Sequence, residues 1–497
     1  MVLSLTRSSG TSLRELFADA TLVGGGDIRA TSVCSDSRQV RAGDVFVAIS
    51  GVDHDGHDHV RQAIERGAKA VLAERQLPIA GVPVCIVSDT RIAYGQLCQA
   101  LADNPSRQLR VIGVTGTNGK TTTAALVKSI LNEAGARTGL LGTLGYFDGY
   151  DAAPASHTTP PAPVLAQWLA RTAAQGCSHA VLEVSSHALC QSRIAGVELD
   201  AAIITNIGHD HLDYHGSVQN YRNAKVRLLS HLSPHGAVVL NIDDPACARL
   251  LSETFHPTLT ISMRSEAELT ATVVERHMGQ QTFLLSAGSD TVPVRTRIIG
   301  DHHVYNCLCA AAVGLTYGFD LREVVRGIEA VTTVTGRMEP IVCGQPFPVF
   351  VDYAHTPDAL EACLAALREV TTGRLICLFG AGGNRDREKR PLMGSIVERL
   401  SDIAIVTSDN PRDEDPRLIA ADVLAGFTTS DHVHTIPDRA EAIAFALQSA
   451  APNDCVVIAG KGHETYQVIG KQRVPFDDRA MTEQMLRRMF PVVRAAA

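Results

Sequence analysis

The feature that most constrains this chain is a loop between an apolar strand and a helix. Residues 111–123 read VIGVTGTNGKTTT, so a β-branched run ends at glycines and is followed by a lysine and three hydroxyls. Apolar residues then recur at helical spacing from Leu126 to Ala134. A loop of this kind presents backbone N–H groups to anionic oxygens at a helix start. The sequence therefore predicts a phosphate-binding loop inside a parallel α/β sheet.

The loop departs from the common eight-residue pattern, because Val114 stands where that pattern has its first glycine. The working unit is therefore the shorter GTNGKT. We expect Lys120 to reach the β/γ-phosphates of a nucleotide and the Thr121 hydroxyl to meet Mg²⁺. The predicted nucleotide-binding residues of the loop are Gly116, Thr117, Asn118, Gly119, Lys120, Thr121 and Thr122.

Length and composition exclude several classes of protein. A chain of 497 residues with 45% hydrophobic residues predicts about three domains with large cores. No window approaches the ~18 apolar residues of a membrane span, and the first residues lack a signal-peptide core, so we expect a cytoplasmic protein. The net charge of −8 argues against nucleic acid as a partner. The twelve cysteines are scattered, which favours buried thiols over a disulfide framework.

Apolar runs separated by helix-compatible segments predict three α/β regions, at 1–107, 108–333 and 334–497. The first is a small domain that ends at the turn-rich residues 103–106. The second is doubly wound around the phosphate loop and carries alternating runs at 263–299 that predict an antiparallel addition. Expected strands lie at 45–49 and 84–87, at 180–184, 201–205 and 237–240, and at 349–352, 375–379, 403–407 and 455–459, with a helix at 60–66.

Polar residues follow several of these strands, where open α/β sheets keep their ligand sites. Glu183 begins the block EVSSH and is a candidate Mg²⁺ ligand, although Ser185 or Ser186 could simply cap a helix. The block HDHLDYH at 209–215 has three histidines, but its acids beside a nucleotide loop favour Mg²⁺ and leave some histidines structural. Residues 221–225, YRNAK, are expected to start a helix whose lysine faces the same end of the sheet, although Lys225 by itself is expected to be a solvated surface lysine.

The order of the motifs resembles a known family. GTNGKTT, EVSSH, DHLDYHG with YRNAK, GRME at 336–339 and DYAHTPDAL at 352–360 are similar to blocks of the Mur ligases of bacterial peptidoglycan synthesis. The resemblance runs from about Ser35 to Arg479. Within the family, GAGGNRDREKRPLMG, SDNPR and AGKGHETYQ are similar to the enzyme that adds the third amino acid. The resemblance implies an N-terminal uridine-nucleotide domain, a central ATPase domain and a C-terminal amino-acid domain.

The resemblance also implies residue roles. Lys225 would be carbamylated and would then bind Mg²⁺ with Glu183 and His211, while Thr121 meets the metal on the nucleotide side. Lys120, Lys225, Glu183 and His211 would form the catalytic group. ATP would also meet His303, Arg337 and Asp352. The UDP-linked substrate would be held by Ser35, Ser37, Val52, Asp53, His54, His157, Thr158, Thr159, Ser185, Gln191 and Arg193, although an arginine such as Arg193 is by itself a surface residue.

One position departs from the family, because His302 and His303 replace its usual Phe-Asn pair. An asparagine donates and accepts together, whereas the contact of His303 to ATP depends on the imidazole tautomer. The amino-acid site implied by the resemblance contains Arg385, Asp409, Asn410, Pro411, Arg412, Gly460 and Glu464. Pro411 would make the loop rigid, and Arg412 would grip the distal carboxylate of meso-diaminopimelate with a planar fork, unless it only closes a surface turn.

The implied reaction is ATP-dependent amide formation through an acyl phosphate, followed by attack of an amine. The implied partners are ATP, Mg²⁺, a UDP-muramoyl dipeptide and meso-diaminopimelate, and we expect a monomer. Two alternatives remain open. The chain could be an L-lysine-adding relative, or it could use the loop as a nucleotide switch without ligation, which leaves the acidic and histidine blocks unexplained.

Overall fold

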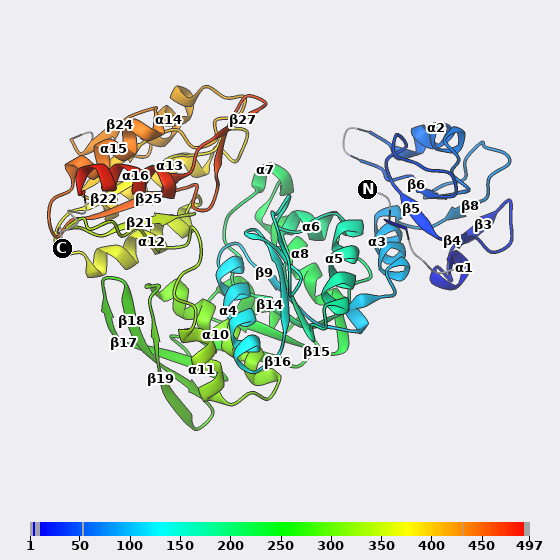
Figure 1. The fold of residues 1–497 in the computed structure, drawn as a ribbon, viewed down its shortest axis with the longest axis horizontal. Coiled ribbons are helices and arrows are strands. Elements are labelled where there is room, and N and C mark those ends of the chain that lie inside the picture. Colours follow the sequence, from blue (N-terminus) through cyan, green and yellow to red (C-terminus); the bar gives the residue numbers. More distant parts are fainter. Residues whose placement is uncertain (1–2, 5–9, 52–53, 430, 492–497) are drawn as a thin grey trace, which may run out of the picture.

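The computed structural model describes residues 3–4, 10–51, 54–429 and 431–491. Three lobes follow one another along the chain, and the central lobe lies between the other two (Figure 1). Helix α3 (Thr90–Leu101) leads from the N-terminal lobe towards the central one and packs on α5 (Ala162–Ala174). The turn at Asp103 and Asn104, both with positive φ, separates α3 from the first central strand. The predicted three-domain α/β architecture is therefore confirmed.

The N-terminal lobe is a six-stranded sheet in the order β1-β5-β6-β7-β8-β3. Strands β5 to β8 are parallel, and β1 and β3 pair antiparallel at the two edges. The elements of this lobe are β1 (Leu3–Ser4), β2 (Thr11–Ser12), α1 (Leu13–Leu16), β3 (Thr21–Val23), β4 (Arg29–Ala30), β5 (Ser32–Cys34), β6 (Val45–Val47), η1 (Gly56–His59), α2 (Val60–Glu65), β7 (Ala70–Ala73), β8 (Val84–Ile86) and α3.

The central lobe is built on an eleven-stranded sheet in the order β12-β11-β10-β13-β9-β14-β15-β16-β17-β18-β19. Seven strands from β10 to β17 are parallel, so their carboxyl ends meet at one edge. The strands are β9 (Arg110–Thr115), β10 (Thr138–Gly142), β11 (Gly145–Phe147), β12 (Ala152–Ala153), β13 (His179–Glu183), β14 (Leu199–Ile204), β15 (Leu232–Asn241), β16 (Thr258–Ser262), β17 (Leu269–His277), β18 (Gln280–Ala287) and β19 (Asp290–Thr296).

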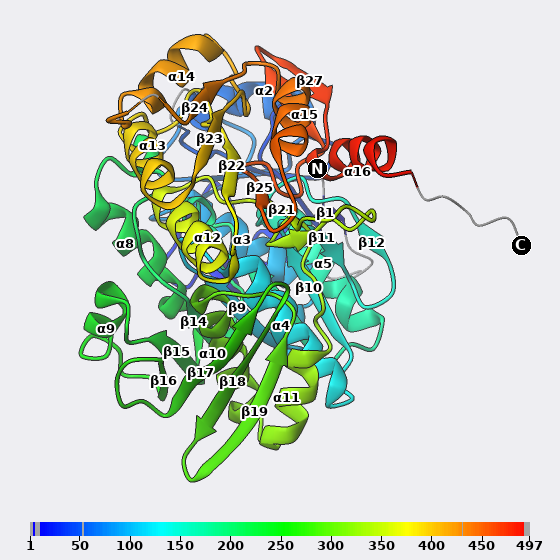
Figure 2. The ribbon, with the colours of Figure 1, turned by 90° about the vertical axis from the view of Figure 1, so that its left-hand side faces the viewer.

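Helices cover both faces of this sheet, and β17 to β19 extend from it as the predicted antiparallel addition (Figures 1 and 2). The main core packs α4 and α10 against apolar residues of the parallel strands. The helical segments are η2 (Pro105–Arg107), α4 (Lys120–Glu133), α5, α6 (Ser186–Cys190), α7 (Leu212–His215), α8 (Val218–Val226), η3 (Arg227–His231), α9 (Pro245–Leu250), α10 (Asp301–Thr316) and α11 (Leu321–Glu329).

The C-terminal lobe has a six-stranded sheet in the order β20-β21-β25-β22-β23-β24, parallel except for β20. A separate hairpin joins β26 to β27. The elements are β20 (Glu339–Pro340), β21 (Val349–Asp352), α12 (Pro357–Val370), β22 (Leu375–Phe379), α13 (Lys389–Leu400), β23 (Ile403–Val406), α14 (Pro416–Leu424), β24 (Val433–Thr435), α15 (Arg439–Ser449), β25 (Cys455–Ala459), β26 (Tyr466–Ile469), β27 (Gln472–Pro475) and α16 (Asp478–Met489).

All twelve cysteines are free thiols, and ten of them are buried, as the scattered spacing predicted. Within the described ranges, no helix is both long and apolar enough to cross a bilayer.

Candidate active site

The phosphate loop connects β9 to α4 at the carboxyl edge of the central sheet. Gly116 has φ +152° and Gly119 has φ +87°, and α4 begins directly at Lys120. A Cβ atom on Gly116 would collide with the Thr205 hydroxyl, and one on Gly119 would collide with the Asn306 amide oxygen. Both glycines are therefore needed for the loop to close, as the sequence predicted.

Two lysines converge on one carbonyl of this loop. The Lys120 ammonium donates to the carbonyl oxygens of Gly116 at 2.8 Å and Thr117 at 3.0 Å, and the Lys225 ammonium donates to the same Gly116 oxygen at 2.6 Å. Within the described residues neither ammonium forms an ion pair with a carboxylate. Burial, and secondarily the charge of Lys120, hold the pKa of Lys225 well below its ordinary value.

The expectation of a surface lysine at 225 is wrong. Helix α8 begins at Val218, so Lys225 lies in its last turn, where its side chain is 1% exposed and lies 4.6 Å from the Tyr221 ring centroid. Exposure statistics for lysine failed here because the lysine is held inside by a contact with the Gly116 carbonyl, which is far away in sequence.

Glu183 lies at the end of β13 and is buried. Its carboxylate accepts from the Thr121 hydroxyl at 2.9 Å and from the Thr143 amide and hydroxyl at 2.9 and 3.0 Å. The Arg337 guanidinium, from the C-terminal lobe, donates to the same Thr121 hydroxyl at 3.2 Å. Ser185 caps α6 through its hydroxyl, as the helix-start interpretation of EVSSH predicted.

The histidine block follows β14 and faces the C-terminal lobe. His209 contacts Asp386 at 2.9 Å, Asp210 lies 3.8 Å from Lys389, and Asp213 lies 3.8 Å from Arg385. His211 has φ +55°, and burial lowers its pKa to about 3. Among the described residues, no three His, Cys, Asp or Glu side chains are grouped as metal ligands.

Several residues predicted for the UDP-linked substrate form one network beside the loop. Arg193 donates to the Thr159 carbonyl at 2.6 Å and to the Gln191 amide oxygen at 2.8 Å. The Thr159 hydroxyl accepts from the Ser185 amide at 3.1 Å, and the Thr158 hydroxyl lies 3.1 Å from that of Thr143. Arg193 is half-buried rather than a free surface arginine.

The other predicted substrate residues are not part of this network. In the N-terminal lobe, Ser37 is buried and donates to Gln62 at 2.6 Å, Ser35 is partly exposed, and His54 is exposed. His157 is an exposed residue of the central lobe that contacts Ser156 at 3.2 Å. Val52 and Asp53 lie outside the described residues.

His303 and Asp352 are both buried. The His303 Nε2 atom lies 3.5 Å from the Cys307 sulfur, and its Nδ1 atom has no hydrogen-bond partner among the described residues. Burial lowers the pKa of His303 to about 3, so the ring is neutral. Asp352 accepts from the backbone amides of Met338 at 2.6 Å and Ala354 at 2.8 Å, and so holds the GRME turn.

The predicted amino-acid loops meet in the C-terminal lobe. The Asn410 amide donates to Glu464 at 2.8 Å, and a Cβ on Gly460, which has φ +111°, would collide with Asp409. Arg412 has φ +52° and donates to the Gly383 carbonyl at 2.7 Å. Its guanidinium forms no ion pair with a carboxylate in the part of the chain that the structure describes.

A cavity of about 720 Å³ lies between the central and C-terminal lobes. Of the predicted residues, those that line it are Thr117, Asn118, Gly119, Lys120, Thr121, Thr122, His157, Thr158, Ser185, Arg193, His211, Lys225, His303, Arg337, Asp352 and Arg385. Four further predicted residues contact lining residues without lining the cavity themselves: Gly116, Glu183, Thr159 and Gln191. Asp409, Asn410, Pro411, Arg412, Gly460 and Glu464 do not line it, and neither do Ser35, Ser37 and His54.

Several residues that line the cavity were not predicted from the sequence. Asn306 contacts the Thr123 hydroxyl at 3.2 Å, and Tyr305 donates to Asp243 at 2.8 Å beside the lining residue Arg264. Tyr305 and Asn306 follow the His302-His303 pair on α10, so the helical register after a recognised motif could have identified them. Arg264 lies outside every motif and carried no signal.

This architecture, in which a phosphate loop faces a second α/β domain across a polar cavity, defines a multidomain nucleotide-binding protein of the P-loop type. Family models match the chain as "Mur ligase family, catalytic domain" at 29–104, "Mur ligase middle domain" at 114–314 and "Mur ligase, glutamate ligase domain" at 336–462. The chain belongs to the Mur ligase family, whose members are ATP-dependent amide ligases.

Relatives agree over nearly the whole length. The chain is 43% identical over 465 residues to UDP-N-acetylmuramoyl-L-alanyl-D-glutamate--2,6-diaminopimelate ligase of Geobacillus thermodenitrificans, covering 92% of this chain and 95% of that protein. The homologue of the same name from Synechococcus elongatus is also 43% identical, covering 91% and 93%. A solved structure of a ligase of that name has TM-score 0.69 at 32% identity, covering 97% and 99%.

A more distant structure shares the fold. MurF ligase from Thermotoga maritima in complex with ADP has TM-score 0.63 at 21% identity, covering 92% of this chain and 98% of that one.

Proposed function

We propose that this enzyme joins meso-diaminopimelate to the D-glutamate γ-carboxylate of UDP-N-acetylmuramoyl-L-alanyl-D-glutamate, with cleavage of ATP to ADP and phosphate. The main support is the cavity between the lobes, because it brings the phosphate loop, Arg193 and the C-terminal residues Arg337 and Arg385 to one space. The names of the 43%-identical relatives point to the same substrates. In a bacterial cytoplasm, this step would extend a peptidoglycan precursor.

The reaction needs two anions to approach each other. The substrate carboxylate attacks the γ-phosphorus of ATP, ADP leaves, and an acyl phosphate forms. Lys120 and Arg337, which both contact the phosphate-loop region, would offset the charge on the transferring group. The neutral amine of the amino acid then attacks the acyl carbon, phosphate leaves, and the amine loses a proton.

The residues present fit Mg²⁺. The Thr121 hydroxyl and the Glu183 carboxylate are hard oxygen donors that already touch at 2.9 Å. Lys225 would add two further oxygens as a carbamate, and its lowered pKa favours the neutral amine that must react with CO₂. His211 would complete the group. The metal, when bound, would neutralise phosphate charge.

We assign the three predicted regions to three ligands. Residues 1–107 would bind the uridine nucleotide through Ser35, Ser37, Val52, Asp53 and His54. The rest of that substrate would be held by His157, Thr158, Thr159, Ser185, Gln191 and Arg193. Residues 108–333 would bind ATP through 116–122 and His303, with Arg337 and Asp352 reaching from the third region. Residues 334–497 would bind the amino acid through Arg385, Asp409, Asn410, Pro411, Arg412, Gly460 and Glu464.

The choice of amino acid would depend on Arg412. Its Nη1 atom is engaged by the Gly383 carbonyl, which leaves other donors of the fork for a carboxylate. Its strained backbone is held by a 2.9 Å hydrogen bond to the Val468 carbonyl, which fixes the direction of the side chain. Meso-diaminopimelate has a distal carboxylate that L-lysine lacks, so lysine would leave the guanidinium without its anion.

A panel of amino acids with the UDP-muramoyl dipeptide and ATP tests this proposal by phosphate release. We expect meso-diaminopimelate to be preferred over L-lysine by ~10⁴ in kcat/KM, and Arg412→Ala to remove most of that preference. Arg417→Ala, on the exposed start of α14, is the matched control and should keep the preference. Equal use of lysine would favour the lysine-adding alternative, and ATP hydrolysis indifferent to both substrates would favour a nucleotide switch.

A further inference from the structure

A buried lysine lies beneath the proposed amino-acid loops. The side chain of Lys461 has 0% exposure, although lysine is almost never fully buried unless it is paired. Its ammonium donates to the Glu464 carboxylate at 2.9 Å, the Tyr466 carbonyl at 2.6 Å and the Asn410 amide oxygen at 3.3 Å. Three donors therefore meet three acceptors, and the group is fully satisfied.

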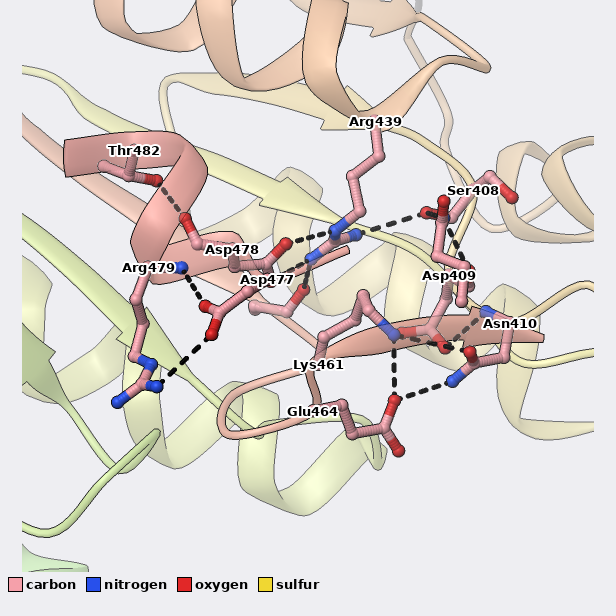
Figure 3. Close-up of polar contacts among 12 residues, drawn as sticks. Ser408, Asp409, Asn410, Arg439, Lys461, Glu464, Asp477, Asp478, Arg479 and Thr482 are labelled. Atoms are coloured by element: carbon pink, nitrogen blue, oxygen red, sulfur yellow. Dashed lines mark hydrogen bonds and ion pairs between the residues drawn. The ribbon is translucent and has the colours of Figure 1, made fainter. Parts of the chain in front are cut away.

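Two of these acceptors also bind each other. The Asn410 amide nitrogen donates to the same Glu464 oxygen that Lys461 contacts, and the Asn410 oxygen accepts from the Val468 amide at 2.9 Å. Lys461, Asn410 and Glu464 thus form a closed triangle of side chains (Figure 3). The triangle ties the loop after β23 to the loop after β25, which are adjacent only through the fold.

A separate buried pair anchors the roots of the same two loops. Arg439 and Asp478 are paired through two 2.7 Å hydrogen bonds, and both side chains have 0% exposure. The Arg439 guanidinium also donates to the Ala459 carbonyl at 2.9 Å and the Ser408 carbonyl at 3.3 Å (Figure 3). Because the backbone roots are held independently, Lys461 is left to orient the side chains at the tips.

The triangle determines what Glu464 can offer a ligand. One carboxylate oxygen is used by Lys461 and Asn410, while the other has no hydrogen-bond partner among the described residues and points away from the triangle in Figure 3. The Glu464 side chain is 21% exposed, so a substrate can reach this oxygen. Lys461 also balances the charge of Glu464, so the site around the free oxygen carries no net charge from this pair.

We propose that Lys461 is a positioning residue that sets amino-acid selectivity. It fixes the free Glu464 oxygen for the ammonium of the amino acid and keeps the surrounding charge balanced, so that a second carboxylate on the substrate is tolerated. This inference rests on the proposed function. Loss of Lys461 would leave an uncompensated carboxylate, which disfavours a substrate with an extra carboxylate more than it disfavours L-lysine.

Steady-state kinetics of Lys461→Met in the full chain tests the proposal. We expect KM for meso-diaminopimelate to rise about 10- to 100-fold, because a hydrogen bond to a charged group is lost. KM for ATP and for the UDP-linked substrate should change less than about 3-fold, and the preference over L-lysine should fall. In a Glu464→Gln background, Lys461→Met should add little, because the carboxylate that it positions is already gone.

Arg374→Met is the matched control. Arg374 pairs with Asp454 at 2.6 Å, and these residues directly precede β22 and β25, at the amino ends of the strands. The loss of Arg374 should therefore alter stability and leave selectivity unchanged. Lys461→Gln, which keeps a donor, should show a weaker form of the same KM pattern and serves if Lys461→Met does not fold. Equal losses for all three substrates, additive effects with Glu464→Gln, or failure of both Lys461 variants to fold would overturn the proposal. An unmodified enzyme that does not use meso-diaminopimelate would instead refute the proposed function.

Discussion

The phosphate loop and the proposed amino-acid loops both lie at carboxyl ends of parallel strands, but their buried lysines have different partners. Lys120 and Lys225 both donate to the Gly116 carbonyl, and no carboxylate pairs with them within the described residues. Lys461 instead has a carboxylate, an amide and a carbonyl as acceptors. The two lysines of the first site therefore lack a paired carboxylate, whereas the charge of Lys461 is balanced by Glu464.

This difference indicates what each site requires. Placing two buried lysines at one carbonyl disfavours the charged form of both. A phosphate group bound near Lys120, or conversion of Lys225 into a carbamate, would relieve this cost. The triangle of Lys461, Asn410 and Glu464 is fully hydrogen-bonded, so it is rigid before the ligand binds. A rigid site favours substrates whose polar groups already match its geometry. We therefore expect substitutions at the phosphate loop to reduce the chemical step and substitutions at the amino-acid loops to change substrate choice.

The most severe test of this contrast is Lys120→Ala. The lysine should interact mainly with charge that develops on the transferring phosphoryl group, so kcat should fall by ~10³ or more while KM for ATP changes much less. Lys128→Ala, on the same helix but placed 3.9 Å from the Phe147 ring, is the control and should stay near the unmodified rate. A rise in KM alone would make Lys120 a ground-state binding residue.

The second test is Lys225→Arg, which keeps the charge but cannot carry a carbamate. Ligase activity should fall by at least about 10², the scale of losing a preorganised electrostatic contact. Intact-mass measurement under CO₂ should detect the carbamate on the unmodified protein and not on the variant. Arg222→Lys in the same helix, which contacts Glu253 at 2.6 Å, should be nearly silent. Undiminished turnover by Lys225→Arg at ordinary Mg²⁺ would contradict the metal role.

Much of the fold was predictable, because its signals are local. Apolar runs located the strands β21, β22 and β25 within a residue or so, and the glycines with positive φ marked the phosphate loop. Periodicity also indicated the antiparallel strands β17 to β19. The ends of strands were predicted less accurately. Strand β15 begins at Leu232 and not at the predicted Ala237, because its pairing with β14 includes Leu232 on the far side of a register shift.

The candidate site was less predictable, because its contacts join distant segments. Lys225 reaches Gly116 across 109 positions, and Arg337 reaches Thr121 across 216. The helix pattern directed Lys225 towards this end of the sheet, but residue statistics alone placed its side chain in solvent, and only the family resemblance implied a role for it in the site. Lys461 lies inside the motif AGKGHETYQ, but its burial depends on Asn410, which follows a different strand of the sheet.

The smallest expected effect concerns stability in acid. The phosphate-loop region and the C-terminal lobe should lose stability in different pH ranges. Burial lowers the pKa of His303 to about 3, whereas an unfolded histidine titrates near 6.5. Below pH 6.5 the unfolded state therefore binds more protons, so the neutral histidine destabilises the fold as pH falls towards 3. In the C-terminal lobe, hydrogen bonds from Arg390 lower the pKa of Glu414 to about 2, so its stabilising contribution is lost only as pH falls below ~4.5.

The free energy of unfolding should fall between pH 6.5 and pH 4.5 in both proteins. The decrease in His303→Asn should be about 2 kcal/mol smaller than the decrease in the unmodified protein. Urea unfolding across this range measures the difference. His434→Asn, at an exposed residue of β24, is the control and should leave the pH dependence unchanged. The absolute stability of His303→Asn can fall because the smaller side chain leaves space, so the slope with pH is the informative quantity. A slope identical to that of the unmodified protein would contradict this prediction, because it would show that His303 has the same pKa in the folded and unfolded states.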